Sequence, residues 1–220
     1  MTLPLEAVTL YRFFRRGDEE TLALQRVSMT LSPGEFVTVV GPSGSGKSTL
    51  LSCLAGLDEP DGGTVFVGGV RMSHQPEPVR ARLRGSTLGL LLQNRNLLQH
   101  LTVKQNVAMT QRIVGRPRPA AAIELLGTLG IADRAAALPR DLSGGELARA
   151  GMAVALANDP SVVLADEPTG ELDGAAELEV LQALRDRAAT GTAILVASHS
   201  PAVAEASDRI IRLADGRIVA

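Results

Sequence analysis

Cysteine and aromatic residues are scarce in this 220-residue chain, which has one cysteine, one tyrosine, four phenylalanines and no tryptophan. The single cysteine, Cys53, excludes an internal disulfide, and we expect it to be a small buried hydrophobic residue. The chain has no apolar run approaching about 18 residues, and its start lacks a basic region followed by a long apolar one. We therefore expect a soluble, cytoplasmic chain, so that any membrane-spanning partner is a separate polypeptide.

An excess of charge of either sign is also lacking. The formal net charge is −2, which provides no broad electrostatic reason to expect nucleic acid as a partner. Lysine is rare, with only Lys47 and Lys104 against 20 arginines. Basic charge in this chain is therefore almost always arginine, and a lysine at a special position suggests a chemical role.

Lys47 lies in such a position, because residues 41–49 read GPSGSGKST directly after the apolar run 36–40. This stretch matches the phosphate-binding pattern G-x-x-x-x-G-K-[ST] that joins a strand to a helix. Its glycines let backbone N–H groups surround a phosphate chain, and the helix N-terminus adds a positive dipole end. Lys47 then supplies a point charge and Ser48 a Mg²⁺ ligand. The predicted phosphate-binding residues are Gly41, Pro42, Ser43, Gly44, Ser45, Gly46, Lys47, Ser48 and Thr49.

The remaining pattern predicts an α/β fold around this loop. Strands are predicted at 7–10, 23–31, 36–40, 64–67, 70–72, 162–165, 193–197, 209–213 and 217–219. The run at 94–158 is instead helical and rich in alanine and leucine. We therefore predict a core with a parallel sheet and N-terminal antiparallel strands, formed by about 1–93 and 159–220, with a helical subdomain inserted at about 94–158.

Two downstream stretches carry chemistry. Ser143 and Glu146 in the sequence LSGGE have the spacing of a helix capping box, and the same serine and glycines could also bind an anion. The apolar strand at 162–165 ends in Asp166 and Glu167. In phosphoryl transfer one carboxylate holds Mg²⁺ and another orients or deprotonates the attacking water, so Asp166 suits the first role and Glu167 the second. An ordinary acidic strand end is the alternative.

In this order the motifs resemble those of the ATP-binding cassette (ABC) ATPases, over residues 11–199. The resemblance implies ATP and Mg²⁺ as ligands, Lys47, Gln93, Glu167 and His199 as catalytic groups, and Ser48, Gln93 and Asp166 as Mg²⁺ contacts. It assigns further nucleotide contacts to Tyr11, Ser143, Gly144, Gly145, Glu146 and Asp173. Tyr11 is expected to pack against adenine, with Phe13 and Phe14 as rivals. His74 and His100 are expected to be structural.

The resemblance also implies partners. In this family the signature stretch LSGGE of one copy completes the phosphate site of another, so we expect a cassette homodimer that closes on ATP. We also expect a separate transmembrane permease, contacted around 94–105, at the cytoplasmic face of a bacterial inner membrane. No nucleic-acid partner is expected, since the chain has no long heptad insertion and no basic surplus.

A finer resemblance is to cassettes of lipoprotein release, macrolide or peptide export, and bacterial cell division. It favours an ATPase that drives an exporter or extractor. The alternative is a mechanical switch that activates an extracytoplasmic enzyme without transport. Leu147, Val154 and Ser200 depart from the family pattern, which commonly has glutamine, arginine and aspartate at these places.

Overall fold

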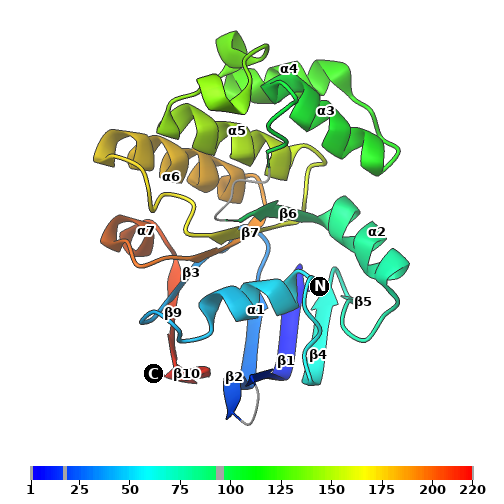
Figure 1. Cartoon of the computed structure of the whole chain (residues 1–220), viewed down its shortest axis with the longest axis vertical. Coiled ribbons are helices and arrows are strands. Elements are labelled where there is room, and N and C mark those ends of the chain that lie inside the picture. The colour runs from blue at the N-terminus through cyan, green and yellow to red at the C-terminus, as the bar shows by residue number, and fades with distance from the viewer. Residues whose placement is uncertain (1, 17–18, 93–96, 220) are drawn as a thin grey trace.

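Two sheets with a helix between them form the lower half of the molecule (Figure 1). The computed structural model describes residues 2–16, 19–92 and 97–219. The first sheet has the strand order β2-β1-β4-β5 and is antiparallel, with β1 (Leu5–Arg16), β2 (Glu19–Leu31), β4 (Gly62–Val67) and β5 (Val70–Arg71). The second has the order β10-β9-β3-β8-β7-β6. It comprises β3 (Phe36–Val40), β6 (Leu88–Leu91), β7 (Val162–Asp166), β8 (Ala193–Ala197), β9 (Arg209–Ala214) and β10 (Arg217–Val219), parallel except for β10.

Strands β3, β7 and β8 of the second sheet are buried on both faces, which explains why they read as continuous apolar runs. On β8, Leu195 belongs to the core that contains helix α1 (Lys47–Leu54) and the antiparallel sheet, whereas Ile194 and Val196 belong to the core on the opposite face. That opposite core contains residues from α3 (Val103–Ile113), α4 (Pro119–Thr128), α5 (Gly144–Leu156), α6 (Gly174–Ala189) and α7 (Pro201–Glu205). Two 3₁₀ turns, Ala132–Arg134 and Pro139–Asp141, join α4 to α5.

Most predicted strands are confirmed, but β6 and the preceding helix α2 (Glu77–Thr87) were not expected. Strand β6 is only four residues long and contains Gly89, so its local pattern is weak. The glycine has a packing reason, because a Cβ there would lie 2.5 Å from the carbonyl oxygen of Ala155 on α5. Strand β1 also extends well beyond the predicted 7–10, since it pairs with β2 on one side and β4 on the other.

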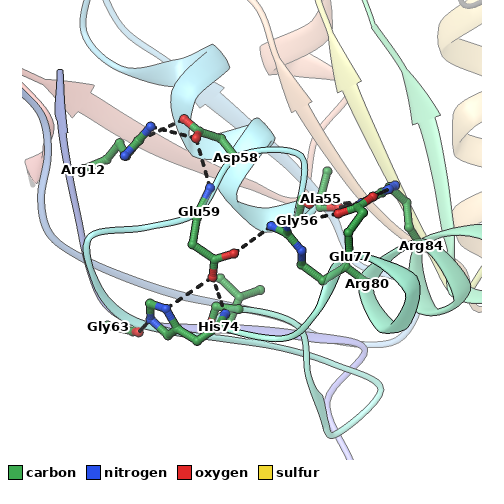
Figure 2. A network of polar contacts seen from close by, with 12 residues as sticks. Arg12, Ala55, Gly56, Asp58, Glu59, Gly63, His74, Glu77, Arg80 and Arg84 are labelled. Carbon is green, nitrogen blue, oxygen red and sulfur yellow. Dashed lines mark hydrogen bonds and ion pairs between the residues drawn. The ribbon is translucent and has the colours of Figure 1, made fainter. Parts of the chain in front are cut away.

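A network of polar contacts ties the antiparallel sheet to the loop after α1 and to α2 (Figure 2). Arg12 of β1 contacts Asp58 at 2.8 Å, and Arg80 of α2 contacts Glu59 at 2.7 Å. His74 also contacts Glu59 and lies 3.2 Å, through Nε2, from the carbonyl oxygen of Gly63. His74 therefore has the structural role expected for it. Among the described residues, no helix is both long enough and apolar enough to cross a bilayer.

Candidate nucleotide site

The loop 41–46 is held tightly between β2, β9 and α1, and glycine is required at several of its positions. Gly44 and Gly46 have φ values of 78° and 103°, a region that disfavours other residues. A Cβ on Gly41 would lie 2.1 Å from the carbonyl oxygen of Leu213, and one on Gly46 would lie 2.4 Å from that of Ala23. Helix α1 begins at Lys47, so its free N–H groups face the loop.

The polar side chains of this loop are available to a ligand. Lys47 Nζ donates to the carbonyl oxygens of Gly41 at 2.8 Å and Pro42 at 3.0 Å. In the described part of the chain it has no carboxylate partner. The Ser45 hydroxyl is buried and has no hydrogen-bond partner among the described residues. A buried hydroxyl of this kind is costly unless an acceptor is supplied, and an anion in the loop could supply one.

The loop opens into a cleft of about 930 Å³. Asp166 and Glu167 from the end of β7 and His199 after β8 line this cleft together with Lys47 and Ser48. The carboxyl ends of adjacent parallel strands meet at one edge of a sheet, where ligands commonly bind. The structure thus brings the predicted phosphate loop, the two predicted carboxylates and the predicted histidine into one site.

Glu167 and His199 contact each other directly. The N–H of Glu167 donates to the carbonyl oxygen of Ala197 at 2.9 Å, which sets the end of β7 beside the segment after β8. Glu167 Oε1 then lies 2.9 Å from His199 Nδ1, and Oε2 accepts a hydrogen bond from Ser198 Oγ at 3.1 Å. Glu167 also has a φ of 48°. Such a left-handed conformation costs a non-glycine residue about 1 kcal/mol or more and is common at functional sites.

Ser200, where the resemblance favours aspartate, is hydrogen-bonded next to this pair. Its hydroxyl donates to Glu177 Oε1 at 2.7 Å, and Thr169 Oγ1 donates to the same oxygen at 2.9 Å. The carboxylate of Glu177 on α6 therefore lies next to residue 200, although residue 200 itself is uncharged. The other departures, Leu147 and Val154, pack against the core that contains α5.

The predicted capping box at the start of α5 is confirmed. Ser143 Oγ accepts from the N–H of Glu146, and Glu146 Oε2 accepts from the N–H of Ser143 at 2.8 Å. The Ser143 N–H, together with an ion pair to Arg134 at 2.7 Å, lowers the pKa of Glu146 to about 2. The predicted contacts at 143–146 and at Asp173, which caps α6 by accepting from the N–H of Ala176 at 2.9 Å, do not line the cleft. Their contact with nucleotide stays a prediction that requires a second copy.

The aromatic residue in the cleft is Phe14 and not Tyr11. Tyr11 lines a separate depression, and its ring packs against Gly62 and stacks with Phe13 at a centroid distance of 6.5 Å. Side chains three positions apart on a strand point to opposite faces, so Tyr11 and Phe14 cannot both face the cleft. This placement favours the rival Phe14 over Tyr11 for the adenine contact, which stays a prediction. The Phe14 ring also lies 4.7 Å from the Arg12 guanidinium.

Gln93, Cys53 and His100 lie outside the cleft or outside the described residues. Gln93, predicted to contact Mg²⁺, lies outside the described residues, so its role stays a prediction. Cys53 is buried on α1, and desolvation raises its pKa to about 12, which confirms the expected packing role. His100 is exposed and does not line the cleft.

Comparison with known proteins supports the interpretation of the cleft as a nucleotide site. Residues 24–170 match the family described as ABC transporter. The chain is 41% identical over 98% of its length to the macrolide export ATP-binding/permease protein MacB of Rhodospirillum rubrum, but spans only 34% of that protein. It is 38% identical over 94% of its length to an uncharacterized ABC transporter ATP-binding protein, MT1014, of Mycobacterium tuberculosis, of which it spans 85%.

Solved structures agree in fold. The dimeric structure of MJ0796, a bacterial ABC transporter cassette, superposes with a TM-score of 0.91 at 32% identity, covering 98% of this chain and 97% of that one. A dimeric post-hydrolysis state of the same cassette, bound to ADP and Pi, also has a TM-score of 0.91, at 31% identity and with the same coverage.

Proposed function

The chain belongs to the ABC transporter family as one of its ATPase cassettes, and we propose that two copies bind and hydrolyse Mg²⁺-ATP to drive a membrane permease. The observation that carries this proposal is the meeting of the phosphate loop, Asp166, Glu167 and His199 in one cleft. The solved post-hydrolysis cassette with ADP and Pi supports hydrolysis as the reaction.

ATP binding is assigned to the loop 41–49 and to Phe14. Backbone N–H groups of the loop and of the first turn of α1 surround the phosphates, and Lys47 exchanges its two carbonyl partners for phosphate oxygens. The adenine ring stacks on Phe14, which is 43% exposed and therefore accessible. The base and the phosphates thereby occupy opposite parts of one cleft.

The cleft also suits Mg²⁺. Ser48 in the first turn of α1 and Asp166 at the end of β7 both line it and offer oxygen ligands, with Gln93 as the third proposed contact. Mg²⁺ is commonly bound by a small number of protein oxygens together with substrate phosphates and waters, and these side chains offer oxygens of that kind. Bound there, Mg²⁺ would neutralise charge on the transferred phosphoryl group.

Glu167 and His199 act on the water and the γ-phosphate. Glu167 orients a water and accepts its proton as the water oxygen bonds to the γ-phosphorus, while the bond to the β–γ bridging oxygen breaks to leave ADP and phosphate. His199 uses Nδ1 toward Glu167, which leaves Nε2 for a hydrogen bond to a γ-phosphate oxygen. Glu167 is thereby positioned before the substrate arrives.

A second copy of the chain completes the site. Ser143 and Gly144 at the start of α5 are exposed, and residues 143–146 lie outside the cleft of their own copy. We propose that Ser143, Gly144, Gly145 and Glu146 contact the ATP held by the other copy, with Asp173 at the same interface. ATP favours the closed dimer because it gains contacts only there, and hydrolysis reopens it.

The permease is proposed to contact α3. A groove of about 700 Å³ lies beside this helix. Its lining includes the apolar residues Leu101 and Met109 and the basic residues Lys104 and Arg112. Helices α3 to α5 would then act as the inserted helical subdomain, at about 94–158, that transmits closure to the membrane. Such a chain works at the cytoplasmic face of the membrane, bound through the permease.

The relative named for macrolide export favours an exporter or extractor. The alternative is a mechanical switch that signals across the membrane, and it would be favoured if the membrane partner co-purified with an extracytoplasmic enzyme and no cargo. Nucleic acid is not a proposed partner.

Light scattering of the Glu167→Gln protein with and without ATP tests the composite site. We expect the Glu167→Gln protein to shift from monomer to dimer when ATP is added. Adding Ser143→Arg to this protein places a bulky cation at the proposed interface, and the double variant should stay monomeric. If the double variant binds ATP and dimerises as well as the Glu167→Gln protein, the proposed interface is wrong.

A further inference from the structure

A second depression, of about 520 Å³, lies beside the nucleotide cleft on the antiparallel sheet. Tyr11, Gln25, Arg26, Ser28, Arg217 and Ile218 line it. Gln25 lines both the depression and the cleft, so one side chain separates the two. The proposed ATP site does not use this depression.

Its two arginines lack acidic partners. Arg26 is exposed, and its guanidinium makes no hydrogen bond or ion pair with any described residue. Arg217 donates through Nε to Gln25 Oε1 at 2.8 Å, which is a neutral acceptor. By contrast, Arg12 and Arg209 of the neighbouring strands each pair with a carboxylate. Two guanidinium groups without a counter-charge therefore share the lining of one depression.

The backbone of β2 is irregular at Gln25 and Arg26. Leu10 pairs with Val27 and Arg12 pairs with Leu24, so β2 contains one residue more than β1 in this interval. The bulge leaves Gln25 and Arg26 as consecutive side chains that are not buried, between the buried Leu24 and Val27. Arg26 has a φ of 55°, a strained conformation for a residue with a side chain. Bulges of this kind redirect side chains next to functional sites.

Hydroxyl donors complete the depression. Ser28 Oγ accepts from the N–H of Thr9 at 2.8 Å, which leaves its own proton free to donate. The Tyr11 hydroxyl makes no hydrogen bond to a described residue. Guanidinium and hydroxyl donors around one hollow are the donor set that phosphate oxygens require.

We propose that this depression is a second anion site, which binds a phosphate group through Arg26, Arg217, Ser28 and Tyr11. The ligand is a soluble phosphate compound or the headgroup of an acidic phospholipid, since both present the same oxygens. The inference goes beyond the proposed ATPase cycle and does not depend on it.

The site is connected to the phosphate loop by hydrogen bonds. Gln25, which holds Arg217, donates through Nε2 to the carbonyl oxygen of Asp215 at 3.2 Å. The next residue, Gly216, donates its N–H to the carbonyl oxygen of Ser45 at 3.1 Å. An anion that draws Arg217 away from Gln25 would therefore disturb a turn that packs directly on the loop.

Calorimetric titration with inorganic pyrophosphate tests the soluble source. The protein is first saturated with Mg²⁺ and a non-hydrolysable ATP analogue, so that the phosphate loop is occupied. Saturable binding is expected, weakened about tenfold by Arg26→Gln and by Arg217→Gln, because a charge-assisted hydrogen bond contributes about 1.5 kcal/mol. Arg26→Lys should retain most of the binding. Arg82→Gln, which removes an exposed arginine of α2 outside the depression, should have no effect.

Flotation with phosphatidylcholine vesicles, with and without phosphatidic acid, tests the lipid source with the same variants. Binding in either assay that is lost with Arg26→Gln and Arg217→Gln supports the site and identifies its source. Absence of binding in both assays, or binding unchanged by both substitutions, would overturn the proposal. Lys47 and the phosphate loop are intact in every variant, so each variant should bind the ATP analogue in the saturation step. A failure of ATP binding would therefore be seen in that step, separately from a failure of the second site.

Discussion

Glu167 Oε1 lies 2.9 Å from His199 Nδ1, although 32 positions separate the two residues in the sequence. The parallel pairing of β7 with β8 brings the two residues together, since Asp166, which precedes Glu167, pairs with Ala197, which lies two positions before His199. The side chains differ in exposure, at 19% for Glu167 and 74% for His199. The histidine is therefore the more accessible member, while the carboxylate is held against the sheet.

We expect Glu167→Gln to abolish turnover while ATP binding is retained. Glutamine is nearly isosteric and its single carboxamide oxygen can still accept one of the two hydrogen bonds. It cannot accept a proton, and loss of a general base lowers the rate by about 10²- to 10⁴-fold. Phosphate release measures turnover, and a fluorescent nucleotide measures binding. Glu205→Gln, at the exposed end of α7, is the matched control. Substantial Mg²⁺-dependent hydrolysis by Glu167→Gln would reject its assignment as the base.

Phe14→Ala is expected to weaken ATP binding, whereas Tyr11→Ala should leave it nearly unchanged. Stacking of a base on an aromatic ring contributes about 1–3 kcal/mol, and only Phe14 lines the cleft. Titration of each variant with a fluorescent nucleotide gives the two affinities. If Tyr11→Ala weakens nucleotide binding and Phe14→Ala does not, Tyr11 and not Phe14 contacts the adenine.

Gly41→Ala should lower the free energy of unfolding by about 1–3 kcal/mol and weaken nucleotide binding, because its Cβ would lie 2.1 Å from the Leu213 carbonyl oxygen. Gly127→Ala is the control, since a Cβ there meets nothing within 4 Å. Gly127 lies in α4, where alanine should stabilise by about 0.5–1 kcal/mol. Thermal unfolding of both variants measures the difference. A Gly41→Ala protein as stable as the parent would show that β9 can move away from the loop.

The ionised Glu146 should stabilise the fold in a pH-dependent way. Its pKa falls from an ordinary value of 4.5 to about 2, chiefly through the Ser143 N–H and then Arg134. Because the folded-state value is the lower one, the contribution is fully present above about pH 4.5 and is lost as the pH falls toward 2. Melting temperatures of the parent and Glu146→Gln should therefore differ at neutral pH and converge in acid. A constant difference would mean that the charge is not responsible.

Leu98→Ala is expected to reduce permease-stimulated ATPase activity while basal activity is unchanged. Leu98 is 44% exposed, whereas its neighbour Leu97 is 8% exposed and belongs to the core with α3. Leu97→Ala should instead destabilise the protein by about 2–4 kcal/mol and reduce both activities. The comparison uses the complex with its permease and the isolated cassette. Equal loss of both activities in Leu98→Ala would indicate a folding or catalytic defect.

Local patterns in the sequence determined the phosphate loop, the capping box of Ser143 and Glu146, and the two carboxylates at the end of β7. Each depends on neighbours within a few residues, so the spacing alone specifies its geometry. Tertiary structure decided the rest. Phe14 and not Tyr11 lines the cleft because β1, paired with β2 and β4, has the face of Phe14 toward it, and the β7–β8 pairing brings Glu167 to His199. Strand register is set by contacts between distant segments, and a shift of one residue reverses the face of every side chain that follows.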